Sequence, residues 1–177
     1  MARIKPLEIA EMNQQQRAQY DRFPSNLTRT ALRTHNSTAG YLSTGASFRE
    51  GNLDPRDREL VIVRVAALSG SAYERMQHLP VARSVGWTDM DILAIEAGDQ
   101  LALGARAAAL LRFVDECVYR VKVSAAAFAC VKAFHTDGEI VELTLLIGHY
   151  MMTARFLETL EVDIDDQPTP WSGLSAT

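Results

Sequence analysis

Apolar residues recur along most of the chain at intervals of three and four, which is the spacing of one face of an α-helix. Alanine is abundant, and glycine and proline are sparse inside the apolar stretches, so each stretch favours helix over strand. The sequence therefore predicts an all-α protein. We expect its helices at about Leu7–Tyr20, Asn26–His35, Pro55–Leu68, Ala72–Val85, Thr88–Gly98, Gly104–Lys122, Ser124–Phe134 and Gly138–Leu160.

Local signals mark the ends of several of these helices. Asp54 can cap a helix that has Pro55 in its first turn, where the N–H that proline lacks would have no partner. Thr136 and the glutamate three residues later form a capping box before the last long helix. The tail at about residues 163–177 is acidic and contains two prolines, so we expect it to be flexible unless Trp171 docks on the fold.

Composition fits one soluble globular domain that spans residues 1–177. The chain has 47% hydrophobic and 23% charged residues, and a chain of this size folds without disulfides or structural metal. Its net charge of -4 gives no attraction to nucleic acid. No stretch approaches eighteen uninterrupted apolar residues, so we expect no membrane span. Cys117 and Cys130 have twelve residues between them and form no C-x-x-C pair, which is typical of reduced thiols in a cytoplasmic protein.

Ionisable residues at apolar helix positions are candidates for chemistry, because burying a charge without a partner is costly. Ser71, Glu74 and His78 fall within an arc of roughly 60° on one helix, with Tyr73 pointing away from them. Three interpretations stay open: a solvated face with a Glu74–His78 pair, a Glu/Glu/His group completed by Glu59 that moves protons, and a metal site.

Other candidates depend on how the helices pack. His149 is either part of a pocket wall or a core histidine, while His35 and His135 are expected to cap helix ends. An anionic substrate would need a cation, for which the candidates are Arg58, Arg64 and Arg75, although each arginine is equally consistent with a surface ion pair. Hydrogen bonds from tyrosine hydroxyls are also considered, at Tyr73 and Tyr150.

Four segments together resemble a known family: Leu53–Ala66, Tyr73-Glu74-x-x-x-His78, Ala82-Arg83-x-x-Gly86, and Ile140–Leu143 with Ile147-Gly148-x-Tyr150. They are similar to the carboxymuconolactone decarboxylase family, which also contains the AhpD-type alkylhydroperoxidases. The resemblance covers roughly Asn26–Val162 and implies an AhpD-like multi-helix bundle. It also implies a homo-oligomer, either a trimer or a hexamer built from trimers, which agrees with the apolar faces left over in the predicted helices.

The redox pair of the AhpD-type members is absent from this chain. In those members a C-x-x-C pair carries out the redox step, and a glutamate and a histidine form a proton relay. By position the resemblance assigns the relay to Glu59 and His78, whereas Ser71 and Glu74 replace the two cysteines and Tyr73 replaces the histidine between them. Because neither serine nor glutamate can act as a thiolate, we expect no thiol peroxidase activity.

The resemblance then implies a cofactor-free decarboxylase or related lyase that acts on a small lactone or carboxylic acid. His78 would be the general acid or base, Glu59 would orient it, and Glu74 would tune the pair. The substrate-binding candidates are Ser71, Tyr73, Arg58, Arg64 and His149. The alternatives are an alkylhydroperoxidase-like oxidoreductase of the peroxiredoxin type and a ligand-binding oligomer without catalysis. We expect a small-molecule substrate and no metal, nucleic acid or membrane partner.

Overall fold

The structure is a computed structural model, and it describes residues 2–169. Every regular element in this range is helical, which confirms the all-α prediction. The elements are a short 3-10 helix η1 (Ile9–Glu11) and the α-helices α1 (Gln14–Arg22), α2 (Asn26–Ala31), α3 (Ser37–Ser47), α4 (Pro55–Ser69), α5 (Ala72–Ser84), α6 (Asp89–Ala97), α7 (Ala105–Arg120), α8 (Ala125–Lys132) and α9 (Asp137–Leu160).

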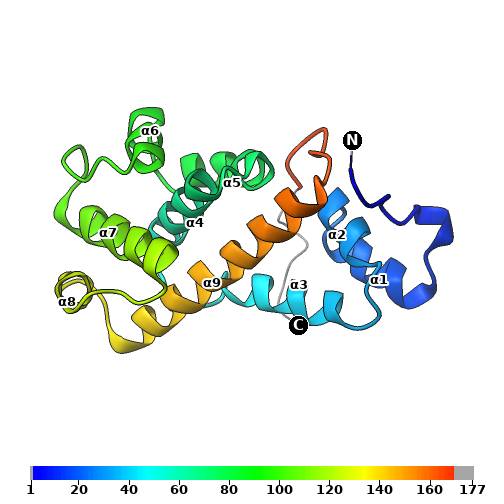
Figure 1. Cartoon of the computed structure of the whole chain (residues 1–177), viewed down its shortest axis with the longest axis horizontal. Coiled ribbons are helices and arrows are strands. Elements are labelled where there is room, and N and C mark those ends of the chain that lie inside the picture. The colour runs from blue at the N-terminus through cyan, green and yellow to red at the C-terminus, as the bar shows by residue number, and fades with distance from the viewer. Residues whose placement is uncertain (1, 170–177) are drawn as a thin grey trace.

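Helix α4 is the centre of the fold and packs against α5, α6, α7 and α9. Residues 60–63 and Val65 in its middle are at most 1% exposed. A helix that is apolar on all sides must be covered on all sides, and this run meets that condition. Figure 1 shows α6, α7 and α8 at one end of the molecule and α1, α2 and α3 at the other.

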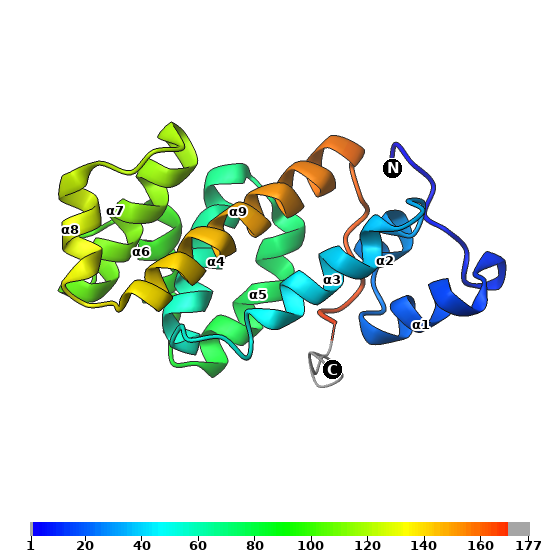
Figure 2. The same cartoon turned by 90° about the horizontal axis from the view of Figure 1, so that it is seen from below.

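Helix α9 crosses α4 and extends from the α8 end of the molecule to the α2 end (Figure 2). In the part of the chain that the structure describes, α9 is the one helix long and apolar enough to cross a membrane. Leu143, Leu146 and Ile147 are completely buried in the core that α4 shares with α9. The apolar residues of α9 therefore fill the centre of a helix bundle.

Helix α3 is absent from the sequence-based prediction. Its sequence contains five serine or threonine residues and two glycines, all poor helix formers, so the periodic signal is weak. Tertiary packing stabilises it instead, because Leu42 and Ala46 are buried. The first predicted helix is also wrong in detail, because the structure divides it into η1 and α1.

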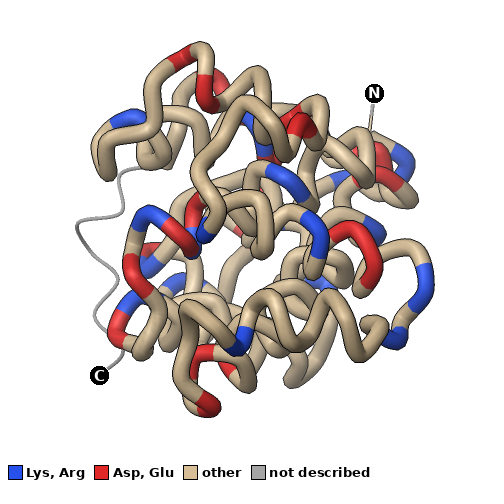
Figure 3. Tube along the Cα trace, turned by 90° about the vertical axis from the view of Figure 1, so that its left-hand side faces the viewer, with Lys and Arg blue, Asp and Glu red and all other residues tan. Residues whose placement is uncertain are grey.

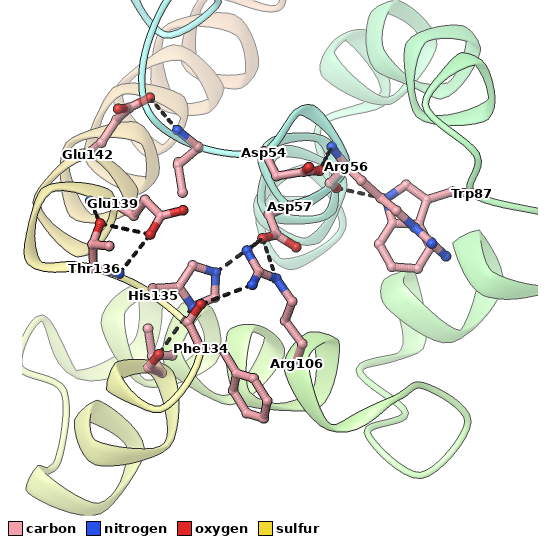
Figure 4. A network of polar contacts seen from close by, with 12 residues as sticks. Asp54, Arg56, Asp57, Trp87, Arg106, Phe134, His135, Thr136, Glu139 and Glu142 are labelled. Carbon is pink, nitrogen blue, oxygen red and sulfur yellow. Dashed lines mark hydrogen bonds and ion pairs between the residues drawn. The ribbon is translucent and has the colours of Figure 1, made fainter.

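A polar network ties the first turn of α4 to distant elements (Figure 4). Asp57 accepts hydrogen bonds from Nε of Arg106 at 2.8 Å and from Nε2 of His135 at 3.1 Å. Arg106 also donates to the carbonyl oxygen of Phe134 at 3.0 Å. We expected His135 only as a helix cap, yet it both contacts the Val131 carbonyl oxygen and bridges to α4. The network fixes α4 against α7 and the loop before α9.

The segment that follows α9 differs from the expected flexible tail over residues 163–169. Asp165 accepts hydrogen bonds from the backbone N–H of Asn26 at 2.8 Å and from Nε2 of Gln77 at 3.0 Å. Thr169 is 4% exposed and its N–H donates to Oε1 of Gln77 at 2.8 Å. We call residues 163–169 the C-terminal strap; Trp171, for which we considered docking, lies outside the described residues.

Charged residues of both signs are interspersed along the chain trace (Figure 3). Large apolar side chains that remain exposed include Phe128 on α8 and Val141 and Leu145 on α9. Such faces are the basis for expecting a homo-oligomer, which stays a prediction.

Candidate functional site

The hairpin of α4 and α5 brings Glu59 and His78 together. Oε2 of Glu59 lies 2.9 Å from Nδ1 of His78, and the two residues are 2% and 5% exposed. Gly70 makes the reversal between the helices possible, since its φ of 66° lies in the left-handed region that glycine adopts without strain. An ionised carboxylate can only accept a hydrogen bond, so Nδ1 of His78 carries the proton in this pair.

The second ring nitrogen of His78 faces helix α9. Nε2 lies 3.1 Å from the hydroxyl oxygen of Tyr150. When the ring carries its proton on Nδ1 alone, Nε2 accepts the hydrogen bond from the Tyr150 hydroxyl. Burial raises the pKa of Tyr150 well above 10, and the negative charge of Glu59 raises it further, so the phenol keeps its proton. Glu59, His78 and Tyr150 thus form a continuous hydrogen-bonded chain across α4, α5 and α9.

Glu59 is held in its charged form. Burial alone would raise its pKa, but the interactions with His78 and then Arg58 outweigh burial, and the pKa lies below the ordinary value for glutamate. Nε of Arg58 donates to Oε1 of Glu59 at 3.1 Å, and Nη1 of Arg58 lies 3.4 Å from the Phe48 carbonyl oxygen. Arg58 therefore acts on Glu59 rather than on a bound substrate.

The hydrogen-bonded chain opens into a pocket with a volume of about 60 Å³. Three aromatic hydroxyls, two glutamate or glutamine side chains and His78 are set among apolar side chains. The lining consists of Phe23, Leu27, Tyr41, Leu42, Gly45, Ala46, Tyr73, Glu74, Gln77, His78, Tyr150, Thr153 and Leu157.

Glu74 lines this pocket but does not pair with His78. Its side chain is buried, at 1% exposure for the residue, and neither carboxyl oxygen has a hydrogen-bond partner. Burial raises the pKa of Glu74 well above the ordinary value, and the negative charge of Glu158 raises it further. The Glu74–His78 pair, which was one of the three interpretations, is therefore not formed, and Nδ1 of His78 contacts Glu59 instead.

The remaining polar groups of the pocket wall are paired with one another or with the strap. The hydroxyl of Tyr41 lies 2.9 Å from Oγ1 of Thr153, and the hydroxyl of Tyr73 donates to Asp165. We expected Tyr73 to point away from Glu74, yet both residues line the pocket. Tyr41, Gln77 and Thr153 also line the pocket, and the sequence did not predict them because their residue types carry no signal of their own.

Four of the five predicted substrate-binding residues lie outside the pocket wall: Ser71, Arg58, Arg64 and His149. Ser71 is the N-cap of α5, and its hydroxyl accepts from the N–H of Glu74. Arg64 donates to Asp115 at 2.6 Å and to the Glu96 carbonyl oxygen at 2.7 Å, so it binds the C-terminal end of α6 to α7. Arg58 is engaged as described, and the further candidate Arg75 pairs with Glu96 near the surface. Each arginine is a structural cation, because a carboxylate or a helix carbonyl already satisfies it.

His149 packs behind the pocket wall. Its ring stacks on Tyr41 with 5.0 Å between centroids and meets Tyr150 edge-on at 5.4 Å. Burial, with a smaller effect of His78, lowers the pKa of His149 to about 4, so the imidazole is neutral at physiological pH. The residue therefore matches the core-histidine interpretation, with Nδ1 lacking a hydrogen-bond partner.

Neither cysteine belongs to the pocket wall, and the described residues form no cluster of metal ligands. Cys117 lies on α7 and Cys130 on α8, and neither lines the pocket. Burial raises the pKa of Cys117, which keeps it as a thiol. Across residues 2–169, no three His, Cys, Asp or Glu side chains are grouped closely enough to hold a metal ion.

Residues 39–116 match the model of the carboxymuconolactone decarboxylase family. The predicted resemblance to this family is confirmed. The matched region runs from α3 into α7, so it contains Glu59, Glu74 and His78, whereas Tyr150 and Asp165 lie beyond it. No curated protein sequence matches the chain.

Two solved structures share the fold of this carboxymuconolactone decarboxylase-like chain. One is an alkylhydroperoxidase AhpD core, an uncharacterized peroxidase-related protein from Ralstonia eutropha JMP134, with a TM-score of 0.79, 17% identity and 93% of each chain covered. The other is a protein of unknown function from Agrobacterium tumefaciens, described as a candidate antioxidant defence protein AhpD. It has a TM-score of 0.71 and 19% identity, and the match covers 77% of this chain and 96% of that one. At these identities the likeness shows the AhpD-like fold alone.

Proposed function

We propose that the protein is a cofactor-free enzyme of the lyase or isomerase type that moves a proton on a small lactone or related carbonyl compound. The observation that carries this proposal is the hydrogen-bonded chain Glu59–His78–Tyr150, which ends at an apolar pocket. An imidazole that a charged carboxylate orients is a common arrangement for general acid–base catalysis.

The chemistry follows from the protonation states of these groups. A C–H bond next to a lactone carbonyl is acidic enough to lose its proton to a nearby base, and the electron pair then rests on the carbonyl oxygen as an enolate. Nε2 of His78 takes the proton, either directly or by way of the Tyr150 hydroxyl, and returns it at another carbon. Glu59 keeps the ring oriented and stabilises the imidazolium that forms meanwhile.

Decarboxylation of a lactone acid, which the family name suggests, would use the same return of a proton. The departing carboxylate would need a cation to bind it before the reaction, however. In the part of the chain that the structure describes, no lysine or arginine lines the pocket. This observation favours an uncharged lactone over a carboxylic acid as the substrate.

The two other functions considered are less well supported. The structural neighbours carry peroxidase-related names, but thiol peroxidases need a low-pKa thiolate in the pocket, and Cys117 and Cys130 lie elsewhere. A ligand-binding oligomer without catalysis would not require a charged glutamate that orients a histidine of the pocket wall.

Proton transfer to a lactone can be measured directly. α-Angelica lactone isomerises by moving one proton from C3 to C5, and in D2O the product gains deuterium that NMR detects. We expect the protein to accelerate this isomerisation or the exchange of C3–H in a panel of small lactones. His78→Asn and Glu59→Gln should lower the rate by about 10² to 10⁴.

The control is the double variant Cys117→Ser/Cys130→Ser, which should keep the full rate. An unchanged rate in His78→Asn, or no exchange into any lactone of the panel, would refute the proposal. Thiol-dependent consumption of peroxide that disappears in the cysteine variant would favour the oxidoreductase instead.

A further inference from the structure

One polar group in the pocket wall has no partner. Across residues 2–169, the buried side-chain atoms without a hydrogen bond are both carboxyl oxygens of Glu74 and Nδ1 of His149. Of these two residues only Glu74 lines the pocket, while His149 is packed behind it. Glu74 is therefore the polar group of the wall that remains available to a ligand.

The other polar groups of the wall are committed to the protein. Tyr73 and Gln77 are hydrogen-bonded to Asp165, and His78 and Tyr150 bind each other. Leaving a buried polar group unsatisfied costs free energy, so native proteins rarely keep one without a use. A residue that lines a pocket and whose buried carboxyl group lacks any partner is the arrangement expected where a ligand supplies the missing hydrogen bond.

The charge of the surroundings decides which form of Glu74 is present. Glu158 on α9 repels a negative charge on Glu74, and burial removes the water that would stabilise it. The hydroxyls of Tyr41 on α3 and Tyr150 on α9 are already used, and His78 on the same helix is bound to Glu59. The neutral acid is thus the stable form, and a neutral carboxyl group has one O–H to donate.

We propose that the pocket selects an uncharged ligand, and that the carboxylic acid of Glu74 donates a hydrogen bond to a carbonyl or hydroxyl oxygen of that ligand. This inference rests on the proposed function in one respect, namely that the reaction takes place in this pocket. A neutral acid in an apolar site can stabilise the negative charge that develops on a carbonyl oxygen during proton abstraction. Glu74 would then complement His78, with one group holding the oxygen and the other moving the proton.

Ligands of either charge fit the site less well. A carboxylate would be transferred from water to a wall with no lysine or arginine among its described residues, which is costly. A protonated amine would meet aromatic faces but would require Glu74 to ionise beside Glu158. The geometry therefore favours the neutral class, and the amine becomes an outcome that the experiment must separate.

Three probes of similar size test this ranking: phenylacetamide, phenylacetate and phenethylamine, which are neutral, anionic and cationic at pH 7. Binding of each to the full chain is measured by isothermal titration calorimetry. We expect phenylacetamide to bind at least about tenfold more tightly than either charged probe. Two variants identify the group responsible: Glu74→Gln keeps a neutral donor of the same shape, whereas Glu74→Leu keeps volume and removes the donor.

Phenylacetamide should bind Glu74→Gln within about threefold of the original chain and should bind Glu74→Leu about tenfold more weakly. Thermal unfolding of both variants checks that they are folded. Tightest binding of phenethylamine, lost in Glu74→Gln, would overturn the proposal in favour of an ionised Glu74. Tightest binding of phenylacetate, or no binding of any probe at millimolar concentration, would overturn it as well.

Glu59→Gln separates this proposal from the proposed function, because Glu59 lies behind His78 and does not line the pocket. The variant should bind phenylacetamide normally while losing proton transfer to lactones. If the variant kept the proton transfer but binding still depended on Glu74, the relay would be refuted and the ligand class would stand. If phenylacetamide bound the Glu74 variants as well as the original chain while His78→Asn and Glu59→Gln lost activity, the ligand class would be refuted and the relay would stand.

Discussion

Oε2 of Glu59 accepts a hydrogen bond from Nδ1 of His78 at 2.9 Å, across nineteen positions of sequence and the turn between α4 and α5. This contact involves a charged carboxylate that is almost completely buried, and Arg58 contacts the other oxygen of that carboxylate. It determines which ring nitrogen carries the proton, and it leaves the other nitrogen for Tyr150. The contact therefore has consequences for stability as well as for catalysis.

The first prediction concerns the acid stability of Glu59→Gln. Because His78 and Arg58 outweigh burial, the folded pKa of Glu59 lies below its unfolded value of about 4.3. The ionised form then adds stability above pH 4.3, and this part is lost as the pH falls through the folded pKa. Glu59→Gln should be less stable at pH 7 by roughly 3 kcal/mol, since Arg58 loses its partner.

Denaturant unfolding between pH 3 and pH 7 measures this difference. The free energy of unfolding should fall less steeply with acid in Glu59→Gln than in the original chain. Glu161→Gln, at an exposed ion pair with Arg3, is the control and should change little. Parallel pH curves for the original chain and Glu59→Gln would contradict the assignment of a low pKa to Glu59.

Glu74→Gln should show the opposite dependence on pH. Burial, reinforced by Glu158, raises the folded pKa of Glu74 above its unfolded value. The group thus favours the folded state most at low pH, and this advantage is lost as the pH rises from about 4.3 toward the folded pKa, by about 1.4 kcal/mol per pH unit. Glutamine does not ionise, so Glu74→Gln does not lose stability in this way. The difference in stability between the variant and the original chain should therefore grow in favour of the variant as the pH rises. Thermal melts at pH 4 to 8 measure this difference.

The core of the candidate site could be predicted because its residues are close in sequence. Glu59 and His78 belong to one helix hairpin, with Asp54 and Pro55 at its start and Gly70 at its turn. The pattern offered their contact as one of three interpretations, and the family resemblance assigned both residues to one proton relay. The all-α fold was predictable for the same reason, since periodicity and capping act within single helices.

The rest of the site depends on long-range packing. Tyr150 contacts His78 across 72 positions of sequence, and Asp165 contacts Tyr73 across 92. Neither contact can be inferred from a local sequence pattern. The strap contains acidic residues and a proline, a composition typical of flexible tails, but Asp165 finds three donors on the fold. The prediction that arginines bind the substrate was wrong for a related reason. An arginine in the sequence fits both an anion-binding site and a structural ion pair, and only the packing distinguishes the two.

Tyr150→Phe tests whether the tyrosine hydroxyl takes part in proton transfer. The variant removes the hydrogen bond to Nε2 of His78 but keeps the ring that packs on it at 5.1 Å. We expect the rate of proton transfer to fall at least about tenfold and the pH profile of the rate to shift, while stability falls by about 1 kcal/mol. Tyr41→Phe is the matched control, because its hydroxyl binds Thr153 on the same pocket wall. Equal losses of rate in the two variants would mean that the hydroxyl of Tyr150 only supports packing.

The cysteines give a prediction about mechanism. Cys117 is half-buried with a raised pKa, and Cys130 is exposed on α8, so neither has the environment of a reactive thiolate near the pocket. Replacing both by serine should leave proton transfer unchanged, and alkylation of the original chain with iodoacetamide should leave it unchanged too. Loss of more than about half of the rate after alkylation would show that a thiol contributes.

Asp165→Asn tests whether Asp165 holds the strap against Tyr73 and Gln77 of the pocket wall. Oδ1 accepts from the N–H of Asn26, and Oδ2 accepts from Tyr73 and Gln77, so one carboxylate holds the strap to α2 and α5. An amide has one acceptor oxygen in place of two, so at least one donor is left without a partner, at a cost of about 1 to 3 kcal/mol. Amide hydrogens of residues 163–169 should exchange faster in this variant, as mass spectrometry of the exchanged chain would detect. Asp166→Asn removes the same charge from an exposed neighbour and should leave exchange as it is; equal exchange in the two variants would show that Asp165 does not hold the strap in place.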